Sequence, residues 1–455
     1  MGGEGRRHSR QPSFKMAGKQ KQRDSLFNHR IDVSGESVLF NAFTGNMVCV
    51  PGGLTNVMDF NFDQRRRLAQ LGFLVDSTHE DEAMSIVNTL VTHSRRMYLI
   101  FTVATSCDLK CSYCFENRTR RSIMSAETLD LSLRWLEKQF AKKRFSDLDV
   151  IIFGGEPLLA PDRLMSLLNG LANIREKHDI CKGARLLTTN ALIGNSSLFK
   201  QLCKLGVTQV QVSFDGDASV TNARRKSHKV TDVYHETLSR LPMLAELSEL
   251  TIKLNFTPET VKSIPMFMDD LSRISARKEK NFRIKPEPIV RYRPYGVEMI
   301  NLKEEFGSND PRLAESFDLI CRLAEERNIE VDLSAVFNTP CMAFRGSSYL
   351  LEPDGSLRSC ISAFGMDSFS LGNVRGGSDH SGQSLALSRR VRDLKGCIEG
   401  RCAFLPMCGG GCPYEKELAT GKKNGILCRR DYFISALPIF VGSAWRTAKH
   451  KLFFL

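Results

Sequence analysis

Residues 102–115 read Thr-Val-Ala-Thr-Ser-Cys-Asp-Leu-Lys-Cys-Ser-Tyr-Cys-Phe and follow an apolar run that begins at Met97. The stretch places Cys107, Cys111 and Cys114 at C-x3-C-x2-C spacing. Thiolates this close on one loop can converge on a single soft metal centre. Because only three are present, a four-iron cluster held here would keep one iron without a protein ligand, and an open metal position can bind a substrate or cofactor. The alternatives are a zinc knuckle that lacks one ligand and three unrelated thiols.

The motif Cys107-x3-Cys111-x-Tyr113-Cys114 resembles the signature of the radical S-adenosylmethionine (SAM) enzymes, including the aromatic residue before the last cysteine. The resemblance implies a [4Fe–4S] cluster whose open iron is chelated by the amino and carboxylate groups of SAM. It also implies that one electron from the cluster cleaves SAM to methionine and a 5′-deoxyadenosyl radical, which abstracts hydrogen from a substrate C–H bond. The cofactor carries that chemistry and the protein orients it. Tyr113 would pack near the adenine.

Length and composition indicate a globular, multidomain chain. For 455 residues the length prior is roughly three domains. The content of 42% hydrophobic and 25% charged residues is ordinary. No apolar run approaches the roughly 20 residues of a membrane span, and no apolar segment follows the basic start as in a secretory signal. Fourteen cysteines without secretion favour metal or redox use in a reducing compartment, so we expect a cytoplasmic protein.

The net charge of +13 is concentrated at the N-terminus. Residues 1–30 carry eight Lys/Arg against Glu4 and Asp24, a net of +6. The tail is also rich in Gly, Ser and Gln, which predicts a disordered basic segment. No recognition motif accompanies the charge, so a solvated tail is favoured over nucleic-acid binding. Met16 is an alternative start of the chain.

Residues 31–96 are predicted to form a small α+β module. The module resembles the N-terminal segment of SAM-dependent peptide maturases, which implies that it holds a leader peptide by adding a strand to a sheet edge. The alternative is a lid on the following domain. Its expected strands and helices are Ile31–Val33, Ser37–Phe40, Met47–Val50, Phe62–Leu71 and Glu80–Thr92.

Strand-like and helix-like segments alternate through residues 97–310. The expected strands are Met97–Val103, Leu148–Phe153, Arg185–Thr188, Gln209–Phe214, Leu250–Phe256 and Phe282–Ile284, and the expected helices are Ala126–Lys142, Asp162–Lys177, Leu198–Lys204, Asp232–Leu247 and Val261–Arg273. Alternation with crossovers of a dozen or more residues predicts a parallel sheet. Six units would make an α/β fold of the partial (β/α)6 barrel type, which the radical SAM family has. Active groups then belong at the C-terminal ends of the strands.

Polar and glycine-rich motifs follow the predicted strands at this rim. Gly154-Gly155-Glu156-Pro157 follows the second strand, where glycines let backbone approach a ligand. In the radical SAM family a GGE-type motif at this place contacts the SAM amino group, which implies that these residues orient the methionine part of SAM. Thr189 and Asn190 follow the third strand, and Asn190 is a further predicted cofactor contact.

The fourth strand ends in Ser213-Phe214-Asp215-Gly216. Family members often continue to His-Asp-x-x-Arg, but here Thr221 and Asn222 stand where His and Asp are usual, while Arg225 is kept. The resemblance implies that Ser213 contacts the ribose hydroxyls and that Arg225 pairs with the SAM carboxylate. A surface salt bridge is the alternative role for Arg225.

Cysteines return after a predicted helix, Pro311–Arg327. Their spacing across residues 311–430 closely resembles the SPASM extension, which binds two auxiliary [4Fe–4S] clusters. The resemblance implies that Cys341, Cys360 and Cys412 hold the first cluster, and that Cys397, Cys402, Cys408 and Cys428 hold the second. Three thiolates leave the first cluster open or dependent on a ligand from elsewhere, including the substrate. A zinc ribbon is the alternative for the second set.

Two further expectations concern this part of the chain. Four residues separate Cys397 from Cys402 where two are usual, and the insertion is expected to loop out. A helical tail over residues 431–455 contains the apolar run Tyr432–Val441, which is too short for a membrane and is expected to dock on the barrel. The remaining cysteines sit in apolar contexts and are predicted to be inert core thiols: Cys49, Cys181, Cys203 and Cys321.

The sequence therefore predicts a radical SAM oxidoreductase with a SPASM domain, using SAM and three [4Fe–4S] clusters. The predicted activity is an intrapeptide cross-link, a thioether or a C–C bond, in a ribosomally made precursor peptide (RiPP), with a small flavodoxin- or ferredoxin-type protein as electron donor. One alternative is a maturase that oxidises Cys or Ser of a sulfatase to formylglycine. Such enzymes usually carry another cysteine shortly after the position of Cys341, which residues 345–348 do not offer. A non-catalytic Fe–S or zinc protein that transfers electrons or senses redox state is the alternative of another class. The sequence nominates no general base.

Overall fold

The computed structural model describes most of the chain. It covers residues 22–50, 60–91, 95–118, 120–142, 145–278, 282–289, 309–333, 341–378, 393–422 and 424–448. Most of the predicted basic tail, with the alternative start Met16, lies outside these residues. Within the described ranges, no helix combines the length and apolar character needed to cross a membrane.

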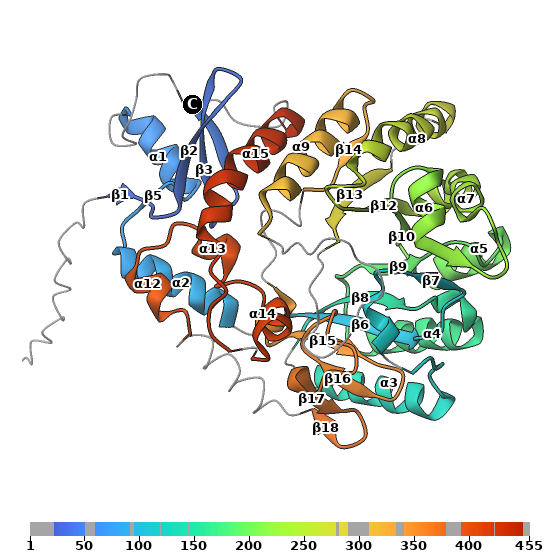
Figure 1. The fold of residues 1–455 in the computed structure, drawn as a ribbon. Helices are drawn as coiled ribbons and strands as arrows, with labels where there is room; N and C mark the ends of the chain where they lie inside the picture. The colour runs from blue at the N-terminus through green and yellow to red at the C-terminus, as the bar shows by residue number, and fades with distance from the viewer. Residues whose placement is uncertain are drawn as a thin grey trace, which may run out of the picture.

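A single sheet of eleven strands organises the described part of the molecule (Figure 1). Its six central strands are parallel, as predicted, in the order β13-β12-β10-β9-β8-β6. They are β6 (Arg96–Ala104), β8 (Asp147–Gly154), β9 (Arg185–Thr189), β10 (Gln209–Phe214), β12 (Glu249–Phe256) and β13 (Arg283–Pro288). The partial (β/α)6 barrel predicted from the sequence is thereby confirmed.

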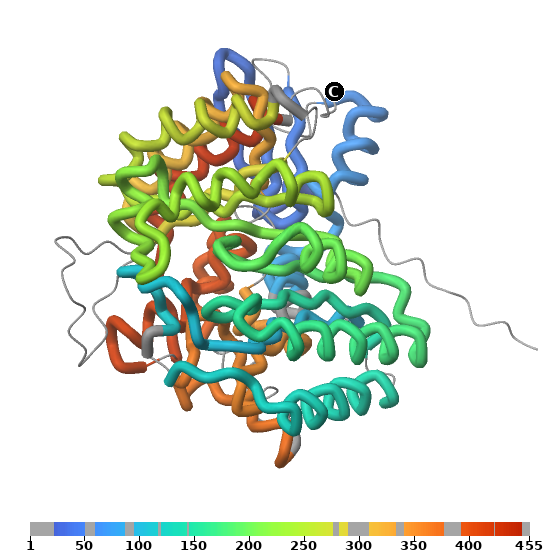
Figure 2. Tube along the Cα trace, turned by 90° about the vertical axis from the view of Figure 1, so that its right-hand side faces the viewer, coloured from blue at the N-terminus to red at the C-terminus, as the bar shows by residue number. Residues whose placement is uncertain are grey.

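Helices return the chain from each strand to the next and cover the outer face of the sheet (Figures 1 and 2). Their inward faces repeat at three- and four-residue spacing, as in α4, where Leu164, Leu168 and Leu171 are fully buried. Six described helices belong to this layer, and among them only α6, a short helix after β10, has no counterpart among the predicted helices. The six are α3 (Ala126–Ala141), α4 (Pro161–Lys177), α5 (Ser196–Lys204), α6 (Ala218–Arg224), α7 (Val233–Leu247) and α8 (Ile264–Lys278).

The central strands are apolar toward the helices and partly polar on their other face. In β12 the side chains of Leu250, Ile252 and Leu254 are buried in the main core, while Lys253 and Asn255 occupy alternate positions. Because successive strand residues point to opposite faces, these polar side chains face the interior of the partial barrel.

Segments at both edges extend the parallel sheet. Helix α9 (Pro311–Glu325) and strand β14 (Glu330–Val331) continue it beside β13, although the sequence interpretation grouped them with the C-terminal domain. At the other edge β15 (Ser348–Leu351) pairs in parallel with β6. The antiparallel strands β16 (Ser356–Arg358), β17 (Ser370–Asn373) and β18 (Gly377–Ser378) then follow β15.

The three strands predicted in the N-terminal module are present, and they form an antiparallel sheet in the order β2-β3-β4. A short pair, β1 with β5, and two helices complete it. The elements are β1 (Arg23–Asp24), β2 (Asn28–Val33), β3 (Glu36–Asn41), β4 (Met47–Val50), α1 (Phe62–Gln70), β5 (Leu74–Val75) and α2 (His79–Val91).

The two ends of the chain share one hydrophobic core. Phe27, Val38 and Phe40 of the module pack in one cluster with Leu437 and Trp445 of α15 (Arg430–Ala448). The blue strands and the red helix lie side by side in both views (Figures 1 and 2). Helix α15 also packs against α9, which belongs to the barrel layer. Cys397 lies in the short helix α12 (Lys395–Glu399), Cys408 ends α13 (Leu405–Cys408), and Cys412 directly precedes α14 (Pro413–Thr420).

Candidate functional site

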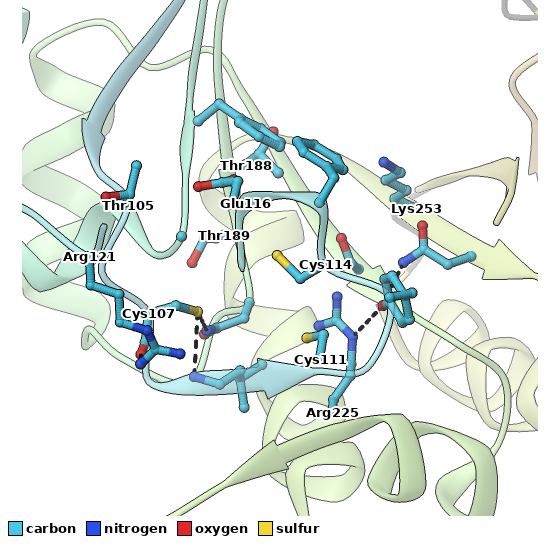
Figure 3. Close-up of a pocket in the computed structure, with 18 residues that line it drawn as sticks. Thr105, Cys107, Cys111, Cys114, Glu116, Arg121, Thr188, Thr189, Arg225 and Lys253 are labelled. Carbon is cyan, nitrogen blue, oxygen red and sulfur yellow. Dashed lines mark hydrogen bonds between the residues drawn. The ribbon is translucent and has the colours of Figure 1, made fainter. Parts of the chain in front are cut away.

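The cysteine loop after β6 forms one side of a cavity at the rim of the barrel. Part of it is a short strand, β7 (Leu109–Cys111), which pairs antiparallel with β11 (Arg225–Ser227). Cys107, Cys111 and Cys114 all line the cavity, which encloses about 1010 Å³ of empty space, part of it open to solvent (Figure 3). Burial raises the pKa of Cys107 and of Cys111 to about 12. Such thiols need a bound cation to become thiolates.

Five of the eight predicted cofactor contacts line this cavity, namely Tyr113, Gly155, Asn190, Ser213 and Arg225. They come from the cysteine loop and from the ends of three strands, β8, β9 and β10, together with β11. Sequence positions more than one hundred residues apart therefore meet at one rim. The other three predicted contacts, Gly154, Glu156 and Pro157, are not part of the cavity wall among the described residues.

The glycines after β8 let two backbones approach each other. The N–H of Gly155 donates to the carbonyl of Ala104 at 2.9 Å, and the N–H of Glu156 donates to that of Ser106 at 2.9 Å. A Cβ on Gly155 would lie 2.4 Å from the oxygen of Ser106. The neighbour that requires glycine is therefore the cysteine loop itself, whereas the sequence interpretation expected a ligand there.

Glu156 faces the protein and not the cavity. Its carboxylate is fully buried and accepts hydrogen bonds from the backbone N–H of Asn190 at 2.7 Å and of Leu158 at 3.0 Å, and from the Thr189 hydroxyl at 2.9 Å. Burial raises the pKa of Glu156 to about 7. The side chain ties the end of β8 to the end of β9, so the prediction that it orients methionine directly does not match its direction.

A buried polar network occupies the opposite wall, between β10, β11 and β12. The Tyr113 hydroxyl donates to Asp215 Oδ1 at 2.6 Å, and Asn255 Nδ2 donates to the same oxygen at 3.0 Å. Arg225 Nε lies 3.3 Å from Asp215 Oδ2 and donates to the Tyr113 hydroxyl at 3.3 Å. The Arg225 side chain is only 8% exposed, so the alternative of a surface ion pair is wrong.

This network keeps Arg225 charged and Tyr113 neutral. Burial acts to lower the pKa of Arg225, but Tyr113 and Asp215 outweigh it and hold the pKa well above its ordinary value. Burial also raises the pKa of Tyr113 well above its usual range. The phenol is thus a hydrogen-bond donor to Asp215, and its hydroxyl is engaged there.

Two hydrogen-bond donors in the cavity wall have no hydrogen-bond partner in the described chain. They are Arg225 Nη1 and the Thr188 hydroxyl, and both are buried. Buried polar groups in folded proteins are nearly always paired, so an unpaired donor in the wall of a cavity fits a polar ligand. The residues present therefore fit a bound molecule that carries both an anionic group and further polar atoms.

Several residues of this wall were not predicted from the sequence, among them Glu116, Thr188, Lys253 and Asn255. For the last two a signal existed, because Leu-Thr-Ile-Lys-Leu-Asn-Phe alternates apolar and polar positions over residues 250–256. A polar face inside a parallel barrel has to line the interior. For Glu116 no such signal existed. Burial, together with the nearby carboxylate of Glu352, raises its pKa to about 8.

The first C-terminal set of cysteines lies together. Burial raises the pKa of Cys360 strongly, and the adjacent thiols of Cys341 and Cys412 raise it further. The pKa of Cys412 rises to about 12 through burial, followed by the charges of Glu415 and Cys341. A buried ion pair between Glu352 and Arg358 supports the segment that carries Cys360.

The second set gathers around α12 and α13. Burial raises the pKa of Cys402, and the nearby thiols of Cys408 and Cys428 add to it. The N–H of Cys402 donates to the carbonyl of Cys397 at 3.0 Å. Residues 398–401 thus complete the end of α12 and its turn and do not loop out. In neither set, nor elsewhere in the described ranges, do three metal-binding side chains surround a point where one metal ion could sit.

Of the four cysteines predicted to be inert core thiols, three are at least partly buried. Cys321 is buried, with its pKa raised to about 12 by burial, and Cys49 and Cys203 are partly buried. Cys181 is exposed in the connection between α4 and β9, which contradicts the expectation of a core position. Its apolar neighbour Ile180 takes the buried position instead.

Comparisons with known proteins agree on the class of this site. Residues 101–271 match the radical SAM superfamily. The chain is 25% identical over 349 residues to the cysteine-type anaerobic sulfatase-maturating enzyme of Clostridium perfringens strain 13, an alignment that covers 69% of this chain and 88% of that enzyme.

Two solved structures share the fold. Native anSMEcpe with bound AdoMet aligns with a TM-score of 0.56 and 18% identity, over 78% of this chain and 98% of that chain. Streptococcus suis SuiB bound to precursor peptide SuiA aligns with a TM-score of 0.54 and 14% identity, over 90% of this chain and 99% of that chain.

Proposed function

We propose that this chain, whose residues 101–271 match the radical SAM superfamily, modifies a peptide or protein by abstracting hydrogen from one of its residues. The observation that carries the proposal is the meeting of Cys107, Cys111 and Cys114 with Arg225 around one rim cavity. The sulfatase-maturating relative and the SuiB complex with a precursor peptide support a polypeptide substrate.

Different residues of the cavity would bind the cluster and SAM. The three thiols would hold a [4Fe–4S] cluster, and Arg225 Nη1 would donate to the carboxylate of SAM. When bound, the cluster and SAM supply the reductive cleavage that yields a hydrogen-abstracting radical. Asp215 and Tyr113 fix the direction of the Arg225 side chain, since each lies 3.3 Å from its Nε.

Other residues of the cavity wall would contact the remaining parts of SAM or the substrate. Ser213 and Asn190 would contact the ribose and its surroundings, while Gly155 and Glu156 would act through the position of the cysteine loop. Lys253 and Asn255, on the strand β12, would face the substrate side.

We propose that the two C-terminal sets hold auxiliary [4Fe–4S] clusters. Cys341, Cys360 and Cys412 would hold the first, and Cys397, Cys402, Cys408 and Cys428 the second. The mutual effects of these thiols on their pKa values support the grouping. Auxiliary clusters can accept the electron that a substrate radical releases when a new bond forms.

The N-terminal module would bind a leader peptide. Its edge strand β4 pairs with β3 alone among the described residues, whereas α15 packs against β2 at the opposite edge. A strand at the edge of a sheet can present N–H and C=O groups with which an extended peptide pairs. With a leader held there, we propose that the product is an intrapeptide thioether or C–C cross-link.

Formylglycine formation is the second candidate. The similarity to the sulfatase-maturating enzyme of Clostridium perfringens favours it. The lack of a cysteine at residues 345–348, shortly after Cys341, speaks against it. An electron-transfer protein without catalysis is the remaining alternative.

Anaerobic reconstitution with iron and sulfide, followed by SAM and dithionite, tests these functions. We expect 5′-deoxyadenosine, and with a short Cys- or Gly-rich peptide encoded next to this protein we expect a product lighter by two hydrogens. An aldehyde trapped by a hydrazine reagent on a sulfatase peptide would identify the second candidate. Intact clusters without 5′-deoxyadenosine would support electron transfer, and zinc in place of iron would overturn both enzyme functions.

A further inference from the structure

The two-stranded ribbon of β7 and β11 has two different faces. Cys111 lies opposite Arg225 in the pairing, and both side chains line the cavity. Since neighbouring strand residues point to opposite faces, the next pair along the ribbon must face away from the cavity. That pair is Lys110 opposite Lys226, and both side chains are exposed.

Two like charges directly across an antiparallel pair destabilise it. Lys229, also exposed, adds a third positive charge two residues after the ribbon. The nearest acidic side chains in the sequence are engaged elsewhere. Asp108 accepts a hydrogen bond from Asn190 at 2.7 Å, and Asp232 contacts Asn222 and His235. Within the described chain neither carboxylate forms an ion pair with Lys110, Lys226 or Lys229.

We propose that this face, formed by Lys110, Lys226 and Lys229, is the docking surface for an acidic electron-donor protein such as a reduced flavodoxin. The inference rests on the proposed function, because it assumes a cluster held by Cys107, Cys111 and Cys114. One electron would pass from the flavin of the donor, across the ribbon, to the cluster that Cys107, Cys111 and Cys114 would hold. No bond forms or breaks in this chain, and the donor is oxidised by one electron for each cluster reduced.

The position of the lysines favours an electron donor over an acidic peptide substrate. A substrate has to reach the cavity, where the reacting atoms meet, but the lysines lie on the opposite face of the ribbon. An electron has only to cross the ribbon, which is a single layer with Cys111 on its inner side. An acidic partner would offset the repulsion between Lys110 and Lys226 and would be steered to this face.

Charge reversal tests the proposal on the reconstituted enzyme. In the Lys110→Glu/Lys226→Glu variant we expect reduction of the cluster by reduced flavodoxin, followed by loss of its visible absorbance, to slow by at least about ten-fold. Reduction by dithionite, which needs no docking surface, should be unchanged. Binding of oxidised flavodoxin, followed by its flavin fluorescence, should weaken in parallel.

The control is Lys142→Glu. This exposed lysine caps α3 at the end of the barrel opposite the rim, and the same change of charge there should leave the flavodoxin reaction unaltered. Equal flavodoxin rates in the wild type and both variants would overturn the proposal, as would weaker binding of substrate peptide with unchanged flavodoxin rates. Loss of iron or of dithionite reduction in the double variant would show a damaged ribbon.

If the double variant is damaged in this way, the salt dependence of the wild-type reaction tests the docking surface instead. Raising the ionic strength from about 0.01 M to 0.15 M shortens the Debye length from about 30 Å to about 8 Å and should slow the flavodoxin reaction steeply. A salt-independent rate would contradict the docking surface. Reduction is measured at the cluster and not through a product. A protein that flavodoxin reduces normally but that forms no 5′-deoxyadenosine would therefore refute the proposed function and not the docking surface.

Discussion

The cysteines at the rim of the barrel come from one loop, residues 107–114, whereas those of the C-terminal region come from segments as distant as Cys341 and Cys412. The first group is positioned by the end of strand β6 and by the pairing of β7 with β11. The second needs β15 to pair with β6, and it needs Tyr414 of α14 to pack against the cluster that contains Cys360. A compact motif thus carries much of its own geometry, while a dispersed set depends on the whole fold.

The largest effect should come from removing one cysteine of each kind. We expect Cys114→Ala to reduce 5′-deoxyadenosine formation to background, because the loop has no fourth thiol to replace it. Cys402→Ala should leave that reaction in place but abolish the modified peptide, since only an auxiliary set loses a ligand. Chromatography of 5′-deoxyadenosine and mass spectrometry of the peptide measure the two effects.

Iron analysis provides the control for this comparison. Each variant should lose about four iron atoms per chain relative to the wild type. Cys181→Ala, at an exposed cysteine outside all three sets, should lose none. Equal loss of 5′-deoxyadenosine in Cys114→Ala and Cys402→Ala would show that the two regions do not act separately.

The Arg225→Met variant tests the binding of SAM at the rim cavity without changing any cysteine. The variant removes the proposed charge-assisted hydrogen bond to SAM, so we expect the Kd for SAM to rise roughly 10- to 100-fold. Arg121→Met is the matched control, because Arg121 also lines the cavity but is exposed. Equilibrium dialysis with labelled SAM measures both, and an unchanged Kd in Arg225→Met would remove Arg225 from the cofactor site.

The contrast between a compact motif and a dispersed set of residues also explains how much of this fold the sequence predicts. The six barrel strands are apolar runs separated by amphipathic helices, and their ends differ from the predicted ones by only a few residues. Since parallel strands place their C-terminal ends together, the rim position of Cys107, Asn190 and Ser213 follows from the order of the elements. The fold class and the meeting of these residues were therefore accessible from sequence.

Side-chain direction was not accessible in this way. Glu156 follows a strand end as expected, but the backbone N–H groups of Leu158 and Asn190 draw its carboxylate into the protein. The ribbon of β7 and β11 consists of three-residue strands that pair across more than one hundred residues, so no local pattern predicts it. The network of Tyr113, Asp215 and Asn255 depends on that ribbon.

Gly155→Ala tests the contact that joins the two strand ends. A Cβ there would lie 2.4 Å from the oxygen of Ser106, and relieving such overpacking typically costs about 1–3 kcal/mol. We expect a lower free energy of unfolding and incomplete iron binding at the rim site. Gly376→Ala, where a Cβ would meet nothing within 4 Å, should leave both unchanged. Normal stability and iron content in Gly155→Ala would show that the loop can move without cost.

The smallest effect concerns His29, which joins the N-terminal module to the second cysteine set. Its ring stacks on Phe404 at 4.9 Å, and its Nε2 lies 3.3 Å from the carbonyl of Ala403, next to Cys402. Burial lowers the pKa of His29 below its ordinary value of 6.5, against the opposing effect of that carbonyl. Unfolding therefore takes up a proton, so the stability that the neutral ring provides is complete above pH 6.5 and is lost as the pH falls below it.

His29→Phe keeps the stacking and removes the titration. Between pH 7.5 and pH 5.5 we expect the melting temperature of the wild type to fall by about 2 °C more than that of the variant. Differential scanning calorimetry measures the difference, and His228→Gln, at an exposed histidine, should behave like the wild type. Equal pH responses would show that the module does not stabilise the second set through His29. A smaller response in the variant would show that part of the stability of the dispersed cysteines depends on a residue from the opposite end of the chain.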